Sequence, residues 1–156
     1  SGACRSMIVC IDTNVLLQAV NPGHHFHIIF DGWFQRRFRW AVSNDVLMEY
    51  EEIITRQSGR HRWLQFVHIL DLAEARGDLI MSVAPSYHFH IVADDPDDNK
   101  FTDCAITADA DYVITEDKHF SPLADAGYKS LPITPQEFIG DIWGVGESVL
   151  YGHIHR

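Results

Sequence analysis

The 156-residue chain is long enough for one domain that buries roughly two thirds of its unfolded surface, which excludes a small disulfide-stapled fold. Apolar residues make up 46% of the chain, and no stretch contains the ~18 consecutive apolar residues of a membrane-spanning helix. The 12 basic and 22 acidic residues give a net charge of −10, which excludes a uniformly basic surface for binding nucleic acid.

The acidic excess lies entirely in the second half of the sequence. Residues 1–76 contain 8 acidic and 8 basic residues, whereas residues 77–156 contain 14 acidic and 4 basic ones. The simplest explanation is a solvated surface that favours solubility. The alternative is that part of the excess forms a site for a divalent cation. Residues 84–98, which include four aspartates within five positions, fit no helix or strand pattern, and such stretches are common at functional sites.

Residues 1–6 are interpreted as an expression remnant, since no hydrophobic segment of a signal peptide follows them. The three cysteines form neither an even disulfide set nor a Cys-x-x-Cys pair. Cys10 and Cys104 lie in apolar stretches typical of buried thiols. These features predict a protein of the reducing cytoplasm.

Strands and helices alternate along the chain. In the first half, the predicted elements are a strand at 7–11, helices at 15–20 and 24–38, a strand at 40–42, a helix capped by Ser43 that runs to about residue 56, and a helix from 58 or 59 to Gly77. In the second half, they are a strand at 79–83, a helix at 99–108, a strand at 112–115, a helical turn at 122–126, a strand at 131–133 and a helix at 135–142. This alternation predicts an α/β fold with a mostly parallel sheet. We expect one domain over residues 7–142 and a C-terminal tail over residues 143–156.

Two of the predicted strands end in acidic residues. Asp12 directly follows the first strand, and Asp117 lies just after the strand at 112–115. Ligands of open α/β sheets bind outside the carboxyl ends of the strands. If these two strands are neighbours, both carboxylates meet at one edge, where they repel each other unless a cation neutralises them. Oxygen ligands of this kind suit Mg²⁺.

Five short motifs follow one another between residues 7 and 139. They are Asp12-Thr13-Asn14-Val15, the sequence SNDVLMEY at 43–50, DPDDNKFTDCA at 95–105, ADYVITED at 110–117 and TPQEF at 134–138. Together they resemble the PIN-domain family, and most closely the toxin branch of bacterial and archaeal toxin–antitoxin systems. The resemblance implies a three-layer α/β/α sandwich with a five-stranded sheet in the order 3-2-1-4-5. It also implies cleavage of single-stranded RNA with Mg²⁺ or Mn²⁺, and it makes the first and fourth strands neighbours.

The resemblance also implies site residues, motif by motif. It gives four catalytic acids that also bind the metal, namely Asp12, Glu49, Asp103 and Asp117. It further gives Asp98 as an auxiliary metal ligand and Asn14, Thr115 and Thr13 as supporting polar residues.

The residue pattern alone leaves other roles open for these acids. Asp12 could cap the helix that follows it, and Asp117 could be a turn residue. Glu49 and Glu51 each border the apolar face of their helix by about 40°, at ~100° per residue, so that only the resemblance selects Glu49. Asp103 lies opposite the apolar face of its helix, where periodicity predicts a solvated charge unless that face lines the cleft.

Basic side chains offer contacts to an RNA backbone, because such contacts need local rather than net positive charge. The candidates are Lys100, Lys118, Arg36, Arg37 and Arg39, and solvated surface charge is the alternative reading for the lysines. The histidines lack cysteine or glutamate partners at ligand spacing, so we do not expect structural zinc.

The leading hypothesis is a metal-dependent endoribonuclease, in which a metal-activated water attacks the phosphodiester and no side-chain nucleophile is needed. One alternative is a phosphohydrolase of the haloacid-dehalogenase kind with Asp12 as its nucleophile, although that chemistry usually places a second Asp where this chain has Asn14. Another is a binding module that keeps the fold without catalysis. The resemblance further implies a small antitoxin partner and a homodimer, with no membrane association.

Overall fold

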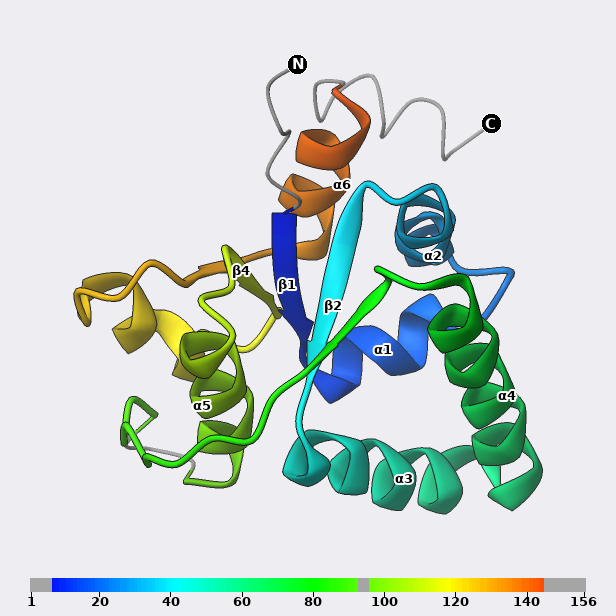
Figure 1. The fold of residues 1–156 in the computed structure, drawn as a ribbon, viewed down its shortest axis with the longest axis horizontal. Coiled ribbons are helices and arrows are strands. Elements are labelled where there is room, and N and C mark those ends of the chain that lie inside the picture. The colour runs from blue at the N-terminus through cyan, green and yellow to red at the C-terminus, as the bar shows by residue number, and fades with distance from the viewer. Residues whose placement is uncertain (1–6, 93–95, 145–156) are drawn as a thin grey trace.

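The computed structural model describes residues 7–92 and 96–144 and shows a five-stranded parallel sheet between layers of helices (Figure 1). The strands are β1 (Met7–Ile11), β2 (Phe38–Val42), β3 (Ile80–Ser82), β4 (Tyr112–Ile114) and β5 (Leu131–Ile133). Their order is β3-β2-β1-β4-β5, which confirms the predicted fold class and sheet order. Because the strands are parallel, their carboxyl ends lie at one edge of the sheet.

Helices form the connections between these strands, and α6 follows the last strand. They are α1 (Thr13–Ala19), α2 (Ile28–Phe34), α3 (Asn44–Ser58), α4 (Arg60–Arg76), α5 (Asn99–Thr107) and α6 (Pro135–Trp143), with the short 3₁₀ helices η1 (His25–His27), η2 (Pro96–Asp98) and η3 (Lys118–Asp125). Ser43 caps α3 as predicted, since its hydroxyl accepts the N–H of Val46 over 3.2 Å. No helix in the described ranges has the length and apolar character needed to cross a membrane.

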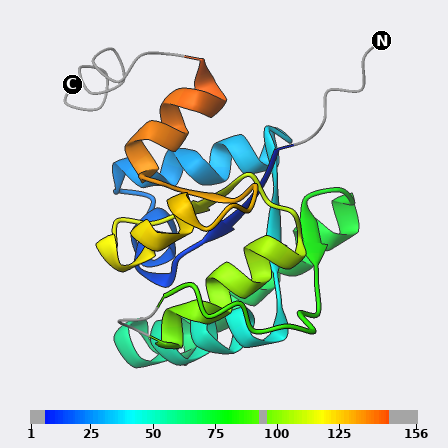
Figure 2. The same cartoon turned by 90° about the vertical axis from the view of Figure 1, so that its left-hand side faces the viewer.

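The core has two apolar layers, one on each face of the sheet. Phe38 of β2 packs edge to face against Phe138 of α6, with ring centroids 5.1 Å apart. Cys10 lies three residues after Met7, the partner of Phe38 in the sheet, so its side chain points to the other face. There it meets Cys104 of α5, and both thiols are free and buried as predicted. Helices α5 and α6 therefore cover opposite faces (Figure 2).

The helix predicted over residues 24–38 is wrong at both ends. The segment instead forms η1 and α2, which ends at Phe34, and β2 begins at Phe38 rather than at residue 40. Arg36 has a φ of 62°, a left-handed conformation that stops a helix, and its guanidinium donates to the carbonyls of Arg76 and Gly77 at the end of α4. The predicted turn at 122–126 is part of the longer η3. Most of the predicted tail, residues 145–156, lies outside the described residues.

Candidate active site

Asp12 lies buried at the carboxyl end of β1, with 5% of its surface exposed. Its backbone N–H donates to the carbonyl of Ile114 over 3.0 Å, which places it beside the end of β4. It stands at the N-cap position of α1, but its side chain makes no capping hydrogen bond. The carboxylate instead accepts the hydroxyl of Thr115 over 2.8 Å and the backbone N–H of Thr13. Helix capping therefore does not explain why an acid is buried here.

The carboxyl group of Asp12 is held in a negative environment. Its pKa is raised from 3.8 to about 6, chiefly by burial and also by the charges of Asp117 and Glu49, while the hydrogen bonds from Thr115 and Thr13 lower it. Asp12 thus interacts electrostatically with two other predicted acids, Asp117 and Glu49. A cation bound among them would relieve both the desolvation of Asp12 and the mutual repulsion.

Asp117 lies at the centre of a second set of possible ligands. One ligand atom each from Asp98, Asp117 and His119 lies within 4.8 Å of the other two. Within the described part of the chain, these three residues form a cluster that could hold a metal ion. Asp98 is the last residue of η2, directly before α5. Asp117 also accepts the backbone N–H of His119 over 2.9 Å and so caps η3, which means that its structural and site roles coexist. Sequence reasoning did not assign His119 a ligand role, although its position two residues after Asp117 was a usable signal.

Glu49 points from α3 toward α5. Its carboxylate lies 3.0 Å from the ammonium of Lys100, and the two side chains are 22% and 25% exposed. Glu51, the competing residue, is exposed on the surface of α3. A hollow of about 520 Å³ opens beside α3, and because Glu49, Glu51 and Lys100 all line it, it does not distinguish the two glutamates. The charge of Glu49 also raises the pKa of Asp12, so Glu49 interacts electrostatically with an acid at the strand ends.

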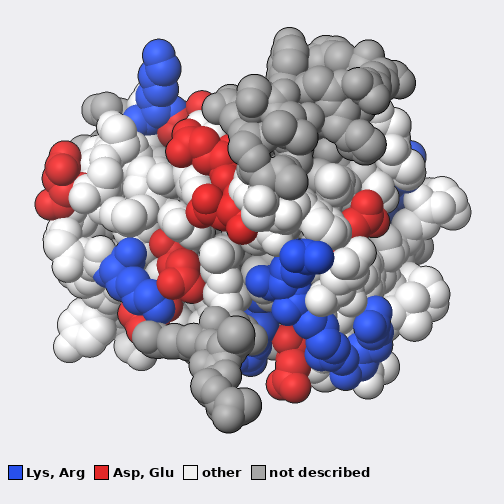
Figure 3. All heavy atoms as spheres, turned by 90° about the horizontal axis from the view of Figure 1, so that it is seen from above, with Lys and Arg blue, Asp and Glu red and all other residues white. Residues whose placement is uncertain are grey.

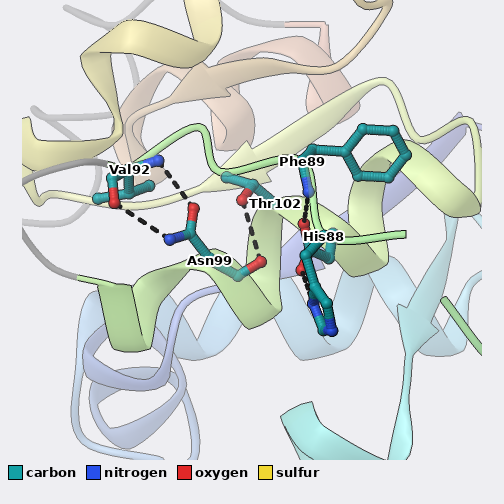
Figure 4. Close-up of polar contacts among 6 residues, drawn as sticks. His88, Phe89, Val92, Asn99 and Thr102 are labelled. Carbon is teal, nitrogen blue, oxygen red and sulfur yellow. Dashed lines mark hydrogen bonds and ion pairs between the residues drawn. The ribbon is translucent and has the colours of Figure 1, made fainter. Parts of the chain in front are cut away.

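Asp103 is buried and bonded to an irregular segment, residues 84–92, that runs along α5. Its two carboxylate oxygens contact the backbone N–H of Phe89 over 2.9 Å and the Nδ1 of His88 over 3.2 Å. Its exposed fraction is 5%, so the solvated charge expected from helical periodicity is not found. Figure 4 shows the hydrogen bonds between this segment and α5. The structure gives Asp103 a part in holding residues 84–92, and its role as a metal ligand remains a prediction.

The three supporting residues have different surroundings. The Thr115 hydroxyl bridges two acids, because it donates to Asp12 and accepts the backbone N–H of Asp117 over 2.9 Å. The Thr13 hydroxyl is buried and has no hydrogen-bond partner among the described residues. Asn14 is exposed in the first turn of α1.

Only the two predicted lysines lie near these acids. Lys100 contacts Glu49, and Lys118 is exposed directly after Asp117. Arg36, Arg37 and Arg39 instead lie around the start of β2, at the opposite edge of the sheet from the strand ends that carry the acids. Figure 3 looks onto that side and shows Lys and Arg side chains gathered there.

Two of the three arginines at this opposite edge, Arg36 and Arg37, stabilise the ends of helices. Arg37 donates to the carbonyl of Ile142 over 2.8 Å, and its guanidinium lies 4.0 Å from the ring centroid of Trp143, so it completes the end of α6. Arg36 does the same for α4. Arg36, Arg37 and Arg39 therefore lie away from the acids, and their contact with an RNA backbone stays a prediction.

The donor set fits a divalent cation of the hard or borderline kind. Asp98, Asp117 and His119 offer two carboxylates and one imidazole within 4.8 Å of one another, and Asp12 and Glu49, which interact electrostatically, offer further carboxylates. Oxygen ligands suit Mg²⁺ and Mn²⁺, and an added nitrogen ligand favours a transition metal. The buried Thr13 hydroxyl without a partner adds one more polar atom next to Asp12.

Comparison with known proteins gives one match. A family model described as the PIN domain matches residues 8–119, which is more than half of the chain and includes all the acids of the site. Proteins with PIN domains are typically nucleases that use divalent metals. No curated protein and no solved structure matches the chain.

Proposed function

The chain belongs to the PIN-domain family, and on that premise we propose that it is a divalent-metal-dependent endoribonuclease that hydrolyses single-stranded RNA. The observation that carries this proposal is the buried carboxylate of Asp12. Burial and the negative charges of Asp117 and Glu49 raise its pKa to about 6. A fold keeps such an unfavourable group where a bound cation compensates for it.

In this proposal each acid has a definite task. Asp12, Asp98 and Asp117 would hold the cation, and Glu49 and His119 would be its further ligands. A cation bound there would supply an activated water and charge neutralisation at the leaving oxygen. Thr115 keeps Asp12 and Asp117 in place through its two hydrogen bonds. Lys100, beside Glu49, is positioned to contact a phosphate oxygen of the RNA.

We also propose, on the strength of the motif resemblance, that the protein is the cytoplasmic toxin of a toxin–antitoxin pair and acts as a homodimer. The dense negative field around Asp12 supports one mode of control, in which the antitoxin places a basic side chain among the acids. Such a partner would lower cleavage of RNA in proportion to its binding. The test is to purify the product of the neighbouring gene and to measure cleavage with and without it.

The test of the enzymatic proposal is cleavage of a labelled single-stranded RNA in Mn²⁺ or in EDTA by the wild type, Asp12→Asn and Asp125→Asn. Asp125 is an exposed acid on η3 and serves as the matched control. We expect cleavage by the wild type and Asp125→Asn in Mn²⁺ only, and none by Asp12→Asn. Equal cleavage by Asp12→Asn would overturn the proposal, and no cleavage by any form would favour the binding module.

The alternative with Asp12 as a covalent nucleophile has its own readout. Incubation with a phosphomonoester followed by mass spectrometry would detect a phosphorylated peptide containing Asp12. We expect none, because the carboxylate is engaged by Thr115 and Thr13 and the position two residues on is Asn14.

A further inference from the structure

An apolar groove of about 550 Å³ opens between α4, the end of α1 and the C-terminal half of α3. These helices lie on the same side of the molecule (Figure 1). None of the acids of the candidate active site lines this groove, which we call the α4 groove. A concave apolar surface that is open to solvent is typical of a binding site. Most of its wall consists of apolar side chains, namely Val20, Pro22, Ile54, Leu64, Phe66 and Ile69.

The α4 groove is joined to the core of the protein through Phe66. The ring centroid of Phe66 lies 5.8 Å from that of Trp40 and 6.1 Å from that of Tyr50, and all three side chains are buried. On the other wall, the Nδ1 of His27 lies 2.7 Å from the carbonyl oxygen of Ala19 and joins η1 to α1. The groove is therefore formed before any ligand arrives, which lowers the entropic cost of binding.

The two segments that carry most of the groove contain no acidic residue. Residues 13–30 have no charged side chain apart from histidines, and residues 53–70 have three arginines, although the whole chain has 22 acids. These segments also hold five of the ten histidines. The side chains at the border of the groove include Arg62, His61 and His68. The α4 groove thus combines an apolar wall with a border that carries positive but no negative side chains.

Arg62 is available to an acidic ligand. Arg56 is already paired with Glu52, whereas Arg62 is exposed and forms no ion pair with a residue of the described ranges. Charges at a protein surface are screened over about 8 Å at physiological ionic strength, so the local arginine, and not the distant acids, decides the charge that a ligand meets. A ligand that carries carboxylates beside apolar side chains therefore fits this groove.

The walls of the α4 groove favour a helical ligand. They are formed mainly by helices, whose backbone groups are bonded internally and cannot pair with an added strand. An extended segment would leave its own N–H and C=O groups unpaired against apolar side chains, which is costly. A helix satisfies its own backbone and presents an apolar stripe. The lining follows α4 from His61 to Ile69, a rise of ~12 Å, or about two turns of a partner helix.

A second copy of the chain is a poorer occupant of the α4 groove. Most dimers are two-fold symmetric and use the same surface on both protomers. Such a dimer would place two positively charged borders against each other, and neither of the segments that form them contains an acid to balance the charge.

We propose that the α4 groove binds an acidic amphipathic helix of a partner protein. The apolar stripe of that helix packs against Leu64, Phe66 and Ile69, and its carboxylates lie beside Arg62 and the histidines of the border. This surface is separate from the acids at the strand ends, so the inference does not rest on the proposed nuclease activity.

The first test is a selection that reports the chemistry of the occupant. A display library carries peptides of about 15 residues, the length at which isolated helices begin to form. Leucines repeat at helical spacing, and the outward positions vary among Glu, Lys, Gln and Ser. The library is selected on the full chain and depleted on the variant Leu64→Glu. We expect the enriched peptides to be rich in glutamate, whereas no enrichment, or enrichment of lysine-rich or uncharged peptides, would overturn the proposal.

The second test is the affinity of an enriched, fluorescent peptide, measured by anisotropy. Leu64→Glu places a charge on the groove wall, and Leu72→Glu makes the same change on α4 outside the groove. These leucines are 51% and 50% exposed, so we expect both variants to fold, which circular dichroism checks. Arg62→Gln removes the charge at the border, and Arg60→Gln, also exposed on α4, is its control.

We expect Leu64→Glu to weaken peptide binding by roughly tenfold or more, as the loss of a central apolar contact does. Arg62→Gln should weaken it by roughly threefold and make it less dependent on salt. The two control variants should bind as the wild type does. Equal affinities of Leu64→Glu and Leu72→Glu would overturn the groove as the binding site, and an unchanged salt dependence in Arg62→Gln would overturn the acidic character of the occupant.

Other occupants of the α4 groove have their own readouts. If light scattering shows a dimer for the wild type and a monomer only for Leu64→Glu, the groove is an interface between two copies of the chain. If the wild type but not Leu64→Glu sediments with vesicles of equal parts phosphatidylcholine and phosphatidylglycerol, the groove binds a membrane. Either result would overturn the proposal.

The groove and the proposed function fail in different ways. Leu64→Glu and the wild type should cleave RNA in Mn²⁺ with the same KM. If the peptide binds through the groove and RNA is not cleaved, the nuclease assignment fails and the groove stands. If the KM for RNA rises in Leu64→Glu but not in Leu72→Glu, RNA occupies the groove, and the proposal of a protein partner fails while the nuclease assignment stands.

Discussion

Thr115 holds Asp12 and Asp117 together: its hydroxyl donates to Asp12 over 2.8 Å and accepts the backbone N–H of Asp117 over 2.9 Å. The two acids come from the ends of β1 and β4, which are neighbours in the sheet. One short side chain between them therefore fixes the separation of two acids that repel each other.

Replacement of Thr115 by Val should raise the pKa of Asp12 above its value of about 6, because the hydroxyl hydrogen bond lowers that pKa. The affinity for Mn²⁺ should fall by roughly tenfold, as is usual when a group that orients a ligand is lost. Thr115→Ser keeps the hydroxyl and should behave as the wild type. The measurements are an NMR titration of the Asp12 carboxyl without metal and calorimetry with Mn²⁺, and identical values for the Val and Ser variants would contradict this role.

Asp12→Asn should stabilise the metal-free protein at neutral pH. The folded protein keeps the proton of Asp12 up to about pH 6, whereas the unfolded chain loses it near pH 3.8. Ionisation of Asp12 therefore lowers the stability of the wild type as pH rises from about 4 to about 6, by about 3 kcal/mol. Urea unfolding in EDTA across this range should show the difference between Asp12→Asn and the wild type growing with pH and then levelling off. A difference that is constant with pH would contradict the raised pKa.

Lys100 should compete with the cation for Glu49. The ammonium lies 3.0 Å from the Glu49 carboxylate, and both side chains are partly exposed. Lys100→Met should therefore raise the affinity for Mn²⁺ by roughly fivefold, which is on the order of 1 kcal/mol for partly screened charges. Lys129→Met removes the same charge beside Asp111 and should leave the affinity unchanged. If calorimetry shows the same increase in Mn²⁺ affinity for both changes, the effect comes from the overall charge of the protein and not from the contact between Lys100 and Glu49.

The Asp103→Asn change tests whether Asp103 is a metal ligand or holds residues 84–92 against α5. The structure connects Asp103 to His88 and Phe89. These contacts use both carboxylate oxygens, so, against the ligand role that the resemblance implies, we expect the affinity for Mn²⁺ to stay within about twofold of the wild type. Hydrogen exchange at the amide of Phe89 should become faster, because a neutral amide is a weaker acceptor than a carboxylate. A loss of Mn²⁺ binding as large as that of Asp12→Asn would instead establish Asp103 as a ligand.

The meeting of Asp12 and Asp117 was predictable, because parallel strands place their carboxyl ends at one edge and the family order makes β1 and β4 neighbours. The choice between Glu49 and Glu51 was not predictable from periodicity, since both border the apolar face of α3. It depends on how α3 meets α5, where Lys100 contacts Glu49.

The burial of Asp103 was also beyond the helical pattern. Periodicity compares the faces of one helix with the core, and it does not register an irregular segment such as residues 84–92 that covers the outer face. The same limit applies to Arg36, whose left-handed conformation ends α2 although its sequence surroundings continue the helical pattern. Tertiary contacts, which the sequence pattern does not show, decide both cases.

The central claim is that the acids at the strand ends bind a catalytic divalent cation. Anomalous diffraction from a crystal soaked in Mn²⁺ tests it most directly. We expect a Mn²⁺ peak in contact with the carboxylates of Asp12 and Asp117, with Asp98 or His119 completing the site. A soaked crystal with no peak at these carboxylates, or with its peak at other residues, would contradict the assignment.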